Sequence, residues 1–494
     1  MLLPITAKKT NDDVIEIGGC KLTELRNVFK TPLYIIDIET IKKQCNEYLE
    51  SFNYGDIQSE IIYASKAFCT VAMCQLIKQL GLSIDVSTGG ELFIALRSGF
   101  EPEKIYFHGN NKSEDEIKFA LDYKVGTFIV DNFDELETLN QLAYQRNIKQ
   151  KIMLRITPGI KAHTHKYIQT GAIESKFGFG LYGGYAHEAV NKALSFENIE
   201  LIGIHAHIGS QIFNIEVYDK LIDTMISFIS EINNKEKITI DKINIGGGLG
   251  IKYTSEDKPA TIKQLSEVVY KAIKKYSEKH KVSINKVYLE PGRSIIGNAG
   301  VTLYEVGNIK YIPQLKNYIA IDGGMSDNIR PVLYQAKYEA WIANRSYYID
   351  SIRDGDVIVN EGYEIKDNNK NNNKNYNNNS EKNSDKNNKE EGSLINYSIV
   401  GKHCESGDVI IEDILLPEVK KGDLILVGST GAYCYSMSSN YNGQPKNAVV
   451  AVENGKCWLW VERQSYEDLV SKDKKLYEYE FCKHDSLFDE KNVY

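Results

Sequence analysis

Short apolar runs, rich in β-branched residues, alternate along the chain with longer segments that have helical spacing. In residues 91–98 and 114–121, for example, apolar positions recur every three or four residues with charges between them. Such alternation is typical of parallel βαβ units. The apolar runs cover residues 61–66, 83–88, 105–110, 128–132, 151–158, 202–209, 242–250 and 287–293. Eight units of this kind predict an α/β fold with a closed (β/α)8 barrel of the TIM type.

The pattern changes after about residue 300, where helical spacing gives way to strand-like alternation. The predicted strands are residues 318–321, 356–359, 397–400, 424–427, 448–452 and 457–461. They predict a mostly-β second domain. We therefore expect an N-terminal segment, 1–32, that packs with the β domain, then the barrel, 33–300, and the β domain, 301–494.

Residues 366–391 form a tract of Asn, Lys, Asp and Glu with almost no apolar side chain. A segment of this composition buries too little apolar surface to offset the entropy lost when it becomes ordered. We expect a disordered insertion in a surface loop of the β domain.

Polar or glycine-rich groups follow nearly every predicted barrel strand. Parallel barrels carry their catalytic groups at this carboxyl edge. The strand ends supply Lys66, Asp85, His108, Arg155, His207, Ser210, Gly248, Glu290, Gly292 and Arg293. The fifth connection, 159–198, is longer than the others, and its Lys176-Phe177-Gly178 predicts an active-site loop.

Three of these features, together with the ring of His207, indicate pyridoxal phosphate. A lysine in a barrel mouth, such as Lys66, is suited to a Schiff base with an aldehyde, although a surface lysine at a strand end is the plainer interpretation. The glycines at 246–248 and 292, after strands seven and eight, lie where this barrel usually binds phosphate. Glu290 is either a capping carboxylate or the partner of a pyridine nitrogen.

His205 and His207 alternate on the sixth strand, so both imidazoles point to the same face, with His207 nearer the rim. One interpretation makes His207 a ring that stacks on a flat cofactor. The alternatives are a metal pair, which would need ligands beyond His108, or a buried structural role. We favour stacking and expect no metal.

Composition narrows the function classes. The formal net charge of −8 comes without a lysine- and arginine-rich stripe, which argues against a nucleic-acid partner. Eight scattered cysteines without a C-x-x-C pair favour free thiols in a reducing compartment, so we expect a cytoplasmic protein. The sequence shows neither a signal-peptide core nor an apolar run of membrane-spanning length.

With these residues, the sequence resembles the fold-type III pyridoxal-phosphate-dependent decarboxylases, which pair an alanine racemase-like barrel with a β domain. The matching motifs are Tyr63-Ala-Ser-Lys-Ala67, His108-Gly-Asn-Asn-Lys112, His207-Ile-Gly-Ser-Gln211, Gly246-Gly-Gly248, Glu290-Pro-Gly-Arg293, Arg330-Pro-Val-Leu-Tyr334, Cys404-Glu-Ser406 and Gly431-Ala-Tyr433. The resemblance implies decarboxylation of meso-2,6-diaminopimelate to L-lysine.

The resemblance also implies a role for each matched residue. Lys66 would form the Schiff base, His207 would stack on the ring and Glu290 would face its nitrogen. Ser210, Gly248, Gly292 and Arg293 would bind phosphate, and we place Asp85 and Arg155 in the same cofactor site. Arg293, Arg330 and Tyr334 would hold a substrate carboxylate, and Glu405 an amino group. Cys404 and Tyr433 would complete the site from a second subunit, which makes the enzyme a homodimer with shared sites.

Other activities of the same fold remain open, namely an ornithine or arginine decarboxylase, an amino-acid racemase, or a regulatory relative that has lost catalysis. Arg330 with Tyr334 suits a distal carboxylate better than a distal cation. One departure concerns the segment before Cys404, where the family usually has Gly-Pro and this chain reads Gly401-Lys402-His403. The shape of that loop is therefore an open question.

Overall fold

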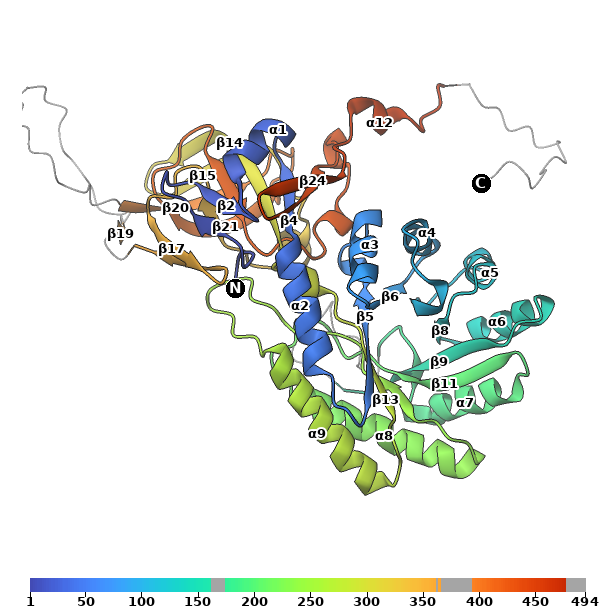
Figure 1. Ribbon diagram of the computed structural model, residues 1–494. Coiled ribbons are helices and arrows are strands. Elements are labelled where there is room, and N and C mark those ends of the chain that lie inside the picture. Colours follow the sequence, from blue (N-terminus) through green and yellow to red (C-terminus); the bar gives the residue numbers. More distant parts are fainter. Residues whose placement is uncertain (161–173, 361–362, 366–392, 477–494) are drawn as a thin grey trace, which may run out of the picture.

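The computed structural model describes residues 1–160, 174–360, 363–365 and 393–476. The predicted barrel is confirmed: in this part of the chain, eight parallel strands pair in sequence order, and the last pairs with the first (Figure 1). These strands are β5 (Gln58–Ala64), β6 (Ser83–Val86), β7 (Ile105–Phe107), β8 (Thr127–Val130), β9 (Gln150–Thr157), β11 (Ile199–His205), β12 (Lys242–Asn244) and β13 (Lys286–Leu289). Each lies on one of the predicted apolar runs.

Helices surround the barrel with their apolar faces turned inward. The helices predicted at 91–98 and 114–121 are α4 (Gly89–Arg97) and α5 (Glu114–Asp122). Ser113 starts α5 with a capping box, because its hydroxyl accepts the Glu116 N–H and the Glu116 carboxylate accepts the Ser113 N–H. The other long helices are α2 (Ile38–Ser51), α3 (Val71–Gln79), α6 (Phe133–Gln145), α7 (Tyr185–Ser195), α8 (Val217–Glu236) and α9 (Ile262–His280).

The second domain is built on a large, mostly antiparallel sheet that lies beside the barrel (Figure 1). Its strands confirm the six predicted runs. They are β15 (Lys316–Ile321), β18 (Asp356–Val359), β20 (Ser393–Val400), β22 (Leu424–Val427), β23 (Ala448–Glu453) and β24 (Lys456–Val461), of which β18 pairs separately with β17 (Ile349–Arg353). The long β14 (Gly300–Ile312) leads from the barrel into this sheet.

A strand near the N-terminus also belongs to the sheet of the β domain. β4 (Leu33–Asp37) pairs antiparallel with β14 and parallel with β23. The predicted limit at residue 33 assigned this run to the barrel. All five residues of β4 are buried, and a short, fully apolar run does not reveal which sheet it joins.

Residues 1–32 pack against the β domain. Ile15 and Ile17 of β2 (Ile15–Ile17) are fully buried in its core, and the Ile15 N–H donates to the Ala343 carbonyl. The remaining domain limits stay predictions, and the insertion at 366–391 lies outside the described residues. In the part of the chain that is described, no helix combines the length and apolarity needed to cross a bilayer.

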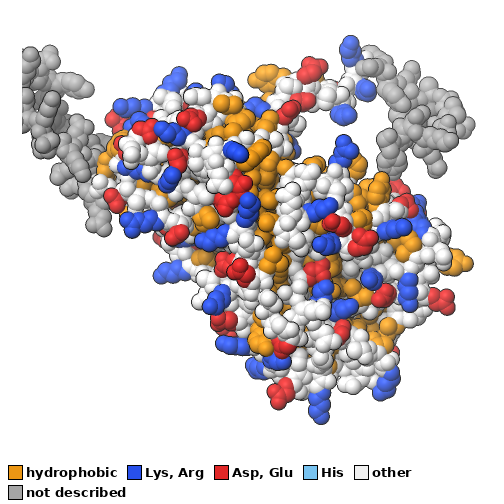
Figure 2. Space-filling model, in the orientation of Figure 1, with side chains coloured by type: hydrophobic (Ala, Val, Ile, Leu, Met, Phe, Trp, Pro, Cys, Tyr) orange, Lys and Arg blue, Asp and Glu red, His pale blue; other side chains and the backbone are white. Residues whose placement is uncertain are grey.

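Acidic and basic side chains are intermixed over the face shown in Figure 2, in keeping with the absence of a basic stripe in the sequence. On the same face, apolar side chains form a band along the junction between the barrel and the β domain.

Candidate active site

A cavity of about 60 Å³ lies at the carboxyl ends of the barrel strands and collects most of the predicted site residues. Those that line it are Lys66, His207, Ser210, Gly248, Glu290, Gly292, Arg293 and Tyr433. A larger hollow, of about 510 Å³, opens at the amino ends of the strands. The predicted chemistry therefore lies in the smaller cavity, at the edge where this fold places its active sites.

Lys66 enters the cavity from a short turn, Ser65–Ala67, that follows β5. Asp85, near the end of β6, is buried and accepts the Ser65 N–H at 3.1 Å. Burial raises the pKa of Asp85 to about 8, although the Lys66 charge opposes this. Desolvation lowers the pKa of Lys66, but attraction to Asp85, Tyr433 and Glu290 outweighs it, so the net shift is upward. The amine thus faces the cavity, and the buried acidic groups near it raise its pKa.

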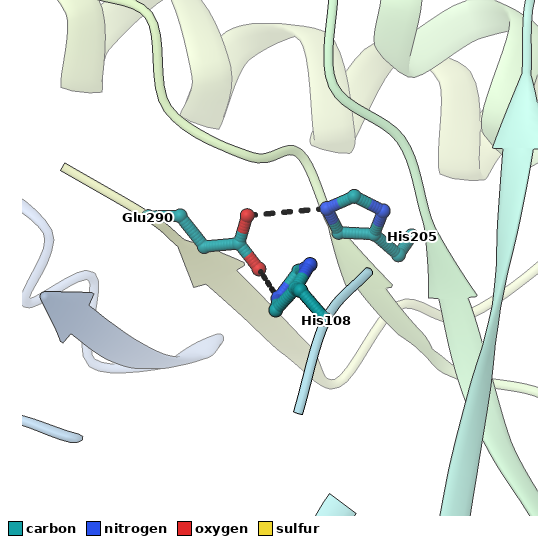
Figure 3. Close-up of side chains that lie close together, drawn as sticks. All are labelled: His108, His205 and Glu290. Atoms are coloured by element: carbon teal, nitrogen blue, oxygen red, sulfur yellow. Dashed lines mark hydrogen bonds and ion pairs between the residues drawn. The ribbon is translucent and has the colours of Figure 1, made fainter. Parts of the chain in front are cut away.

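Glu290 is buried and held by three side chains, two of which Figure 3 shows. Its Oε1 lies 2.9 Å from His108 Nε2 and accepts the Asn244 amide at 2.8 Å. Its Oε2 lies 3.1 Å from His205 Nε2. Burial alone would raise the pKa of Glu290, but the two imidazoles outweigh it and hold that pKa well below its usual value. Glu290 is therefore a fixed negative charge in the cavity wall.

The histidines that lie close together are not the His205–His207 pair that the sequence offered as possible metal ligands. The atoms that lie close enough to ligate one ion, within 4.8 Å of one another, belong to His108, His205 and Glu290 rather than to His205 and His207. His207 instead accepts the Gly247 N–H on Nδ1 at 3.3 Å. Burial, with the nearby positive charges of Lys66 and Arg155, puts the pKa of His207 well below its usual value. A neutral, flat ring therefore faces the cavity.

The glycine loop after β12 exposes bare backbone. Gly246 and Gly248 have φ values of 68° and 124°, in the region that favours glycine. A Cβ at Gly247 would clash with the Glu290 carbonyl, and one at Gly248 with the Gly209 carbonyl. Close backbone of this kind is suited to cradle an anion.

Arg293 and Ser210 border the same part of the cavity. The Arg293 Nε and Nη2 donate to Ser210 Oγ at 3.2 and 3.0 Å. The guanidinium thus lies beside a hydroxyl, and both groups can donate hydrogen bonds to a phosphate or a carboxylate.

Two guanidiniums lie against the phenol of Tyr253. Arg293 Nη1 donates to its hydroxyl at 2.5 Å, and the Arg330 guanidinium lies 4.7 Å from its ring centre. Arg330 is buried and donates to the Tyr338 hydroxyl, while its Nε has no hydrogen-bond partner among the described residues. Tyr334, on the same short helix, has its ring centre 5.9 Å from this guanidinium. The two guanidiniums, with the tyrosines around them, are suited to bind a carboxylate.

Tyr433 corrects one prediction. We expected it to enter the site from a second subunit, but it lines the Lys66 cavity of its own chain. Its N–H donates to the Ala67 carbonyl at 2.8 Å, and its ring lies 4.7 Å from the Arg293 guanidinium. The preceding Gly431 lies so close to the Ile296 carbonyl that a Cβ would clash. This contact fixes the 431–433 turn to the barrel of the same chain.

The family described as "Pyridoxal-dependent decarboxylase, pyridoxal binding domain" matches residues 38–297. The diaminopimelate decarboxylase of Bacillus subtilis (strain 168) is 41% identical over 473 residues, which cover 96% of this chain and 98% of that protein. The enzyme of the same name from Staphylococcus aureus (strain COL) is 37% identical over 95% of this chain and 100% of its own length. The chain belongs to the diaminopimelate decarboxylase family.

A solved structure supports this family assignment. The diaminopimelate decarboxylase of M. jannaschii, determined in complex with L-lysine, superposes with a TM-score of 0.81 at 31% identity and covers 96% of this chain and 99% of its own. The lysine/ornithine decarboxylase of Vibrio vulnificus, at 20% identity and a TM-score of 0.66, shares the fold.

The remaining predicted residues lie outside the lining of the cavity. Cys404 and Glu405 are exposed on the loop between β20 and β21 (Val409–Leu416). Arg155 lies near the end of β9, where its guanidinium stacks on Phe177 at 4.2 Å and lies 3.7 Å from Asp131. The predicted Lys176-Phe177-Gly178 loop thus packs on a predicted cofactor residue, while residues 161–173 lie outside the described chain.

Sequence reasoning missed Asn244 and Tyr253 at this site, and it singled out His205 without its contact to Glu290. His205 and Asn244 hold Glu290, and their positions at strand ends were the available signal. Tyr253 had no signal, because its role comes from two arginines that are distant in sequence.

Proposed function

We propose that this member of the family uses pyridoxal phosphate to decarboxylate meso-2,6-diaminopimelate, which gives L-lysine and CO2. The observation that carries the proposal is the single cavity that brings Lys66 together with Glu290 and the glycine loop. When bound, pyridoxal phosphate supplies an electron sink for the bonding electrons released as CO2 leaves.

The residues of the cavity fit this cofactor. Lys66 presents an amine for its aldehyde, and His207 presents a neutral ring to its face. The Gly248 backbone, with Ser210 and Arg293, would bind its phosphate. Glu290 stays ionised because His108 and His205 hold it, so it can keep a proton on the pyridine nitrogen. The buried Asp85 and Arg155 set the charge around the lysine.

The substrate assignments rest on charge. Arg293, Arg330 and Tyr334 would hold the carboxylate that is retained in the product, and Glu405 would bind an amino group. Cys404 would deliver a proton to the carbon that has lost CO2. Because Cys404 and Glu405 are exposed on a loop outside the cavity, we propose that they serve the site of a second copy in a homodimer. A cytoplasmic location stays a prediction.

The test is release of CO2 from meso-diaminopimelate, with ornithine and arginine as competing substrates and with pyridoxal phosphate present or removed. We expect CO2 and L-lysine only from the diamino diacid, and only with cofactor. Putrescine formed from ornithine at a comparable rate would favour the ornithine-type alternative. Cofactor binding without turnover of any of the three would favour an inactive regulatory relative.

A further inference from the structure

The loop that carries Cys404 is anchored by backbone hydrogen bonds at Gly401 and Lys402. The Lys402 N–H donates to the Gly323 carbonyl at 3.0 Å, a bond that proline cannot form. The Gly401 N–H donates to the Asp408 carbonyl at 2.9 Å. The backbone before Cys404 is therefore tied to a neighbouring segment, where a proline would instead restrict it from within.

His403 adds a tether made by a side chain. It is buried, whereas its neighbours Lys402 and Cys404 are exposed. Its Nε2 lies 2.8 Å from Ser326 Oγ in a hydrogen bond, and its ring meets the ring of Tyr441 at 5.5 Å between centres. One face of the loop is thus held inside the β domain while Cys404 points outward.

Three segments meet around His403. Asp408 joins two of them, because its carboxylate accepts the N–H groups of His403 at 2.9 Å and Met325 at 2.6 Å. The third segment contributes Asn442, which accepts the Cys404 N–H at 3.0 Å, and Ser439, whose N–H donates to the Ser326 carbonyl at 3.0 Å.

The Ser326 segment continues directly into α11 (Arg330–Tyr334). The hydrogen bond between His403 and Ser326 therefore links the loop of Cys404 and Glu405 to the helix that bears Arg330. In the proposed dimer, the loop would deliver its proton donor to the partner's site, whereas Arg330 would bind substrate at the site of its own chain. Since each depends on ångström-scale placement, a tether between their segments bears directly on turnover.

We infer that His403 is a positioning residue, which holds the Cys404–Glu405 loop in register with the Arg330 segment through Ser326. The inference rests on the proposed role of Cys404. His403 itself touches neither cofactor nor substrate in this assignment. Its effect is to reduce the number of conformations from which the thiol must be delivered.

A double-mutant cycle tests the tether. His403→Phe keeps the ring against Tyr441 and removes the hydrogen bond, and Ser326→Ala removes the same bond from the other side. We expect each to lower kcat for meso-diaminopimelate by about tenfold, and the double variant to fall no further than the worse single one. His403→Gln, whose amide can still bond Ser326, should recover most of kcat. Cofactor content should stay at the wild-type level in all of them.

His280→Phe is the matched control. His280 also makes one hydrogen bond of 2.8 Å, to Asp223, and lies near one tyrosine ring, but on the helical layer of the barrel. The His280→Phe variant should leave kcat unchanged. A second readout is amide hydrogen exchange of the holoenzyme, which should speed up by about tenfold across 401–408 in His403→Phe and Ser326→Ala, and not in His280→Phe.

Cys404→Ala separates the two hypotheses. If Cys404→Ala keeps full turnover, the proposed proton donor is wrong. If Cys404→Ala is inactive while His403→Phe keeps wild-type kcat and exchange, only the positioning role is overturned. Additive losses in His403→Phe/Ser326→Ala would also overturn it, since they would show two independent effects rather than one shared bond.

Discussion

The Arg293 guanidinium, at the carboxyl edge of the barrel, lies 4.7 Å from the ring centre of Tyr433, which belongs to the β domain of the same chain. The barrel and the β domain of one subunit thus form the cofactor cavity together. Cys404, in contrast, lies on an exposed loop outside its lining. Part of the β domain therefore lines the cavity of its own barrel, and in the proposed dimer another part would serve the partner.

We predict that Lys66→Ala abolishes covalent binding of the cofactor. Of the lysines in the described chain, Lys66 alone lines the cavity with the glycine loop. Purified wild-type protein should absorb at roughly 420 nm, as protonated Schiff bases of this cofactor do, and the variant should not. Borohydride trapping followed by peptide mapping checks the site. Trapping of another lysine in the variant would show that the attachment site is misassigned.

Shared sites predict complementation between two inactive proteins. When Lys66→Ala and Cys404→Ala exchange subunits, half of the dimers are mixed, and each mixed dimer has one site with both lesions and one intact site. About a quarter of wild-type activity should return if exchange is random and complete. Activity is measured after exchange has been verified with tagged subunits. No recovery would place Lys66 and Cys404 within one chain.

Tyr433 supplies the matched control for this experiment. Because it lines the cavity of its own chain, mixing Lys66→Ala with Tyr433→Phe creates no intact site. The mixture should show only the mean activity of the two parents. Recovery above that mean would mean that Tyr433 reaches the partner's site, contrary to the structure.

The chemistry at the rim of the barrel was predictable because it follows local patterns. Each apolar run marks a strand, and the polar residue after it falls at the carboxyl edge. Lys66, His207, Ser210, Gly248 and Glu290 accordingly line one cavity, and their roles stay predictions.

Long-range pairing was not predictable in the same way. β4 reads like a barrel strand, yet it joins the sheet of the β domain, since a run of buried apolar residues carries no information about its neighbours. Tyr433 lines the cavity of its own chain because Gly431 packs closely on Ile296. This contact joins residues more than a hundred positions apart in the sequence.

His205 predicts a pH dependence of stability. Burial lowers the pKa of His205 to about 4, despite attraction to Glu290. Between about pH 6.5 and 4, His205 is therefore protonated in the unfolded chain but largely neutral in the folded chain. This contribution to stability is fully present above pH 6.5 and is lost as the pH falls toward 4. His205→Gln keeps a donor for Glu290 but does not titrate.

Urea unfolding of the apo-protein from pH 7 to pH 4 measures this contribution. Over that range the wild type should lose up to about 3 kcal/mol more unfolding free energy than His205→Gln. Parallel curves for the two proteins would show that His205 is protonated alike in the folded and unfolded states.

Arg330→Lys should weaken substrate binding and spare the cofactor. Arg330 is buried between Tyr253 and Tyr338, with its Nε unpartnered among the described residues. Lysine offers a point charge in place of a planar fork, so we expect the KM for meso-diaminopimelate to rise about tenfold or more while cofactor absorbance is unchanged. Inhibition by L-lysine, which retains a carboxylate, should weaken in parallel, whereas inhibition by cadaverine, which has none, should not. Arg345→Lys, at an ion pair with Asp423 in the same domain, should leave all three constants as they are. Equal losses for L-lysine and cadaverine would show that Arg330 supports the fold of the site and does not bind a carboxylate.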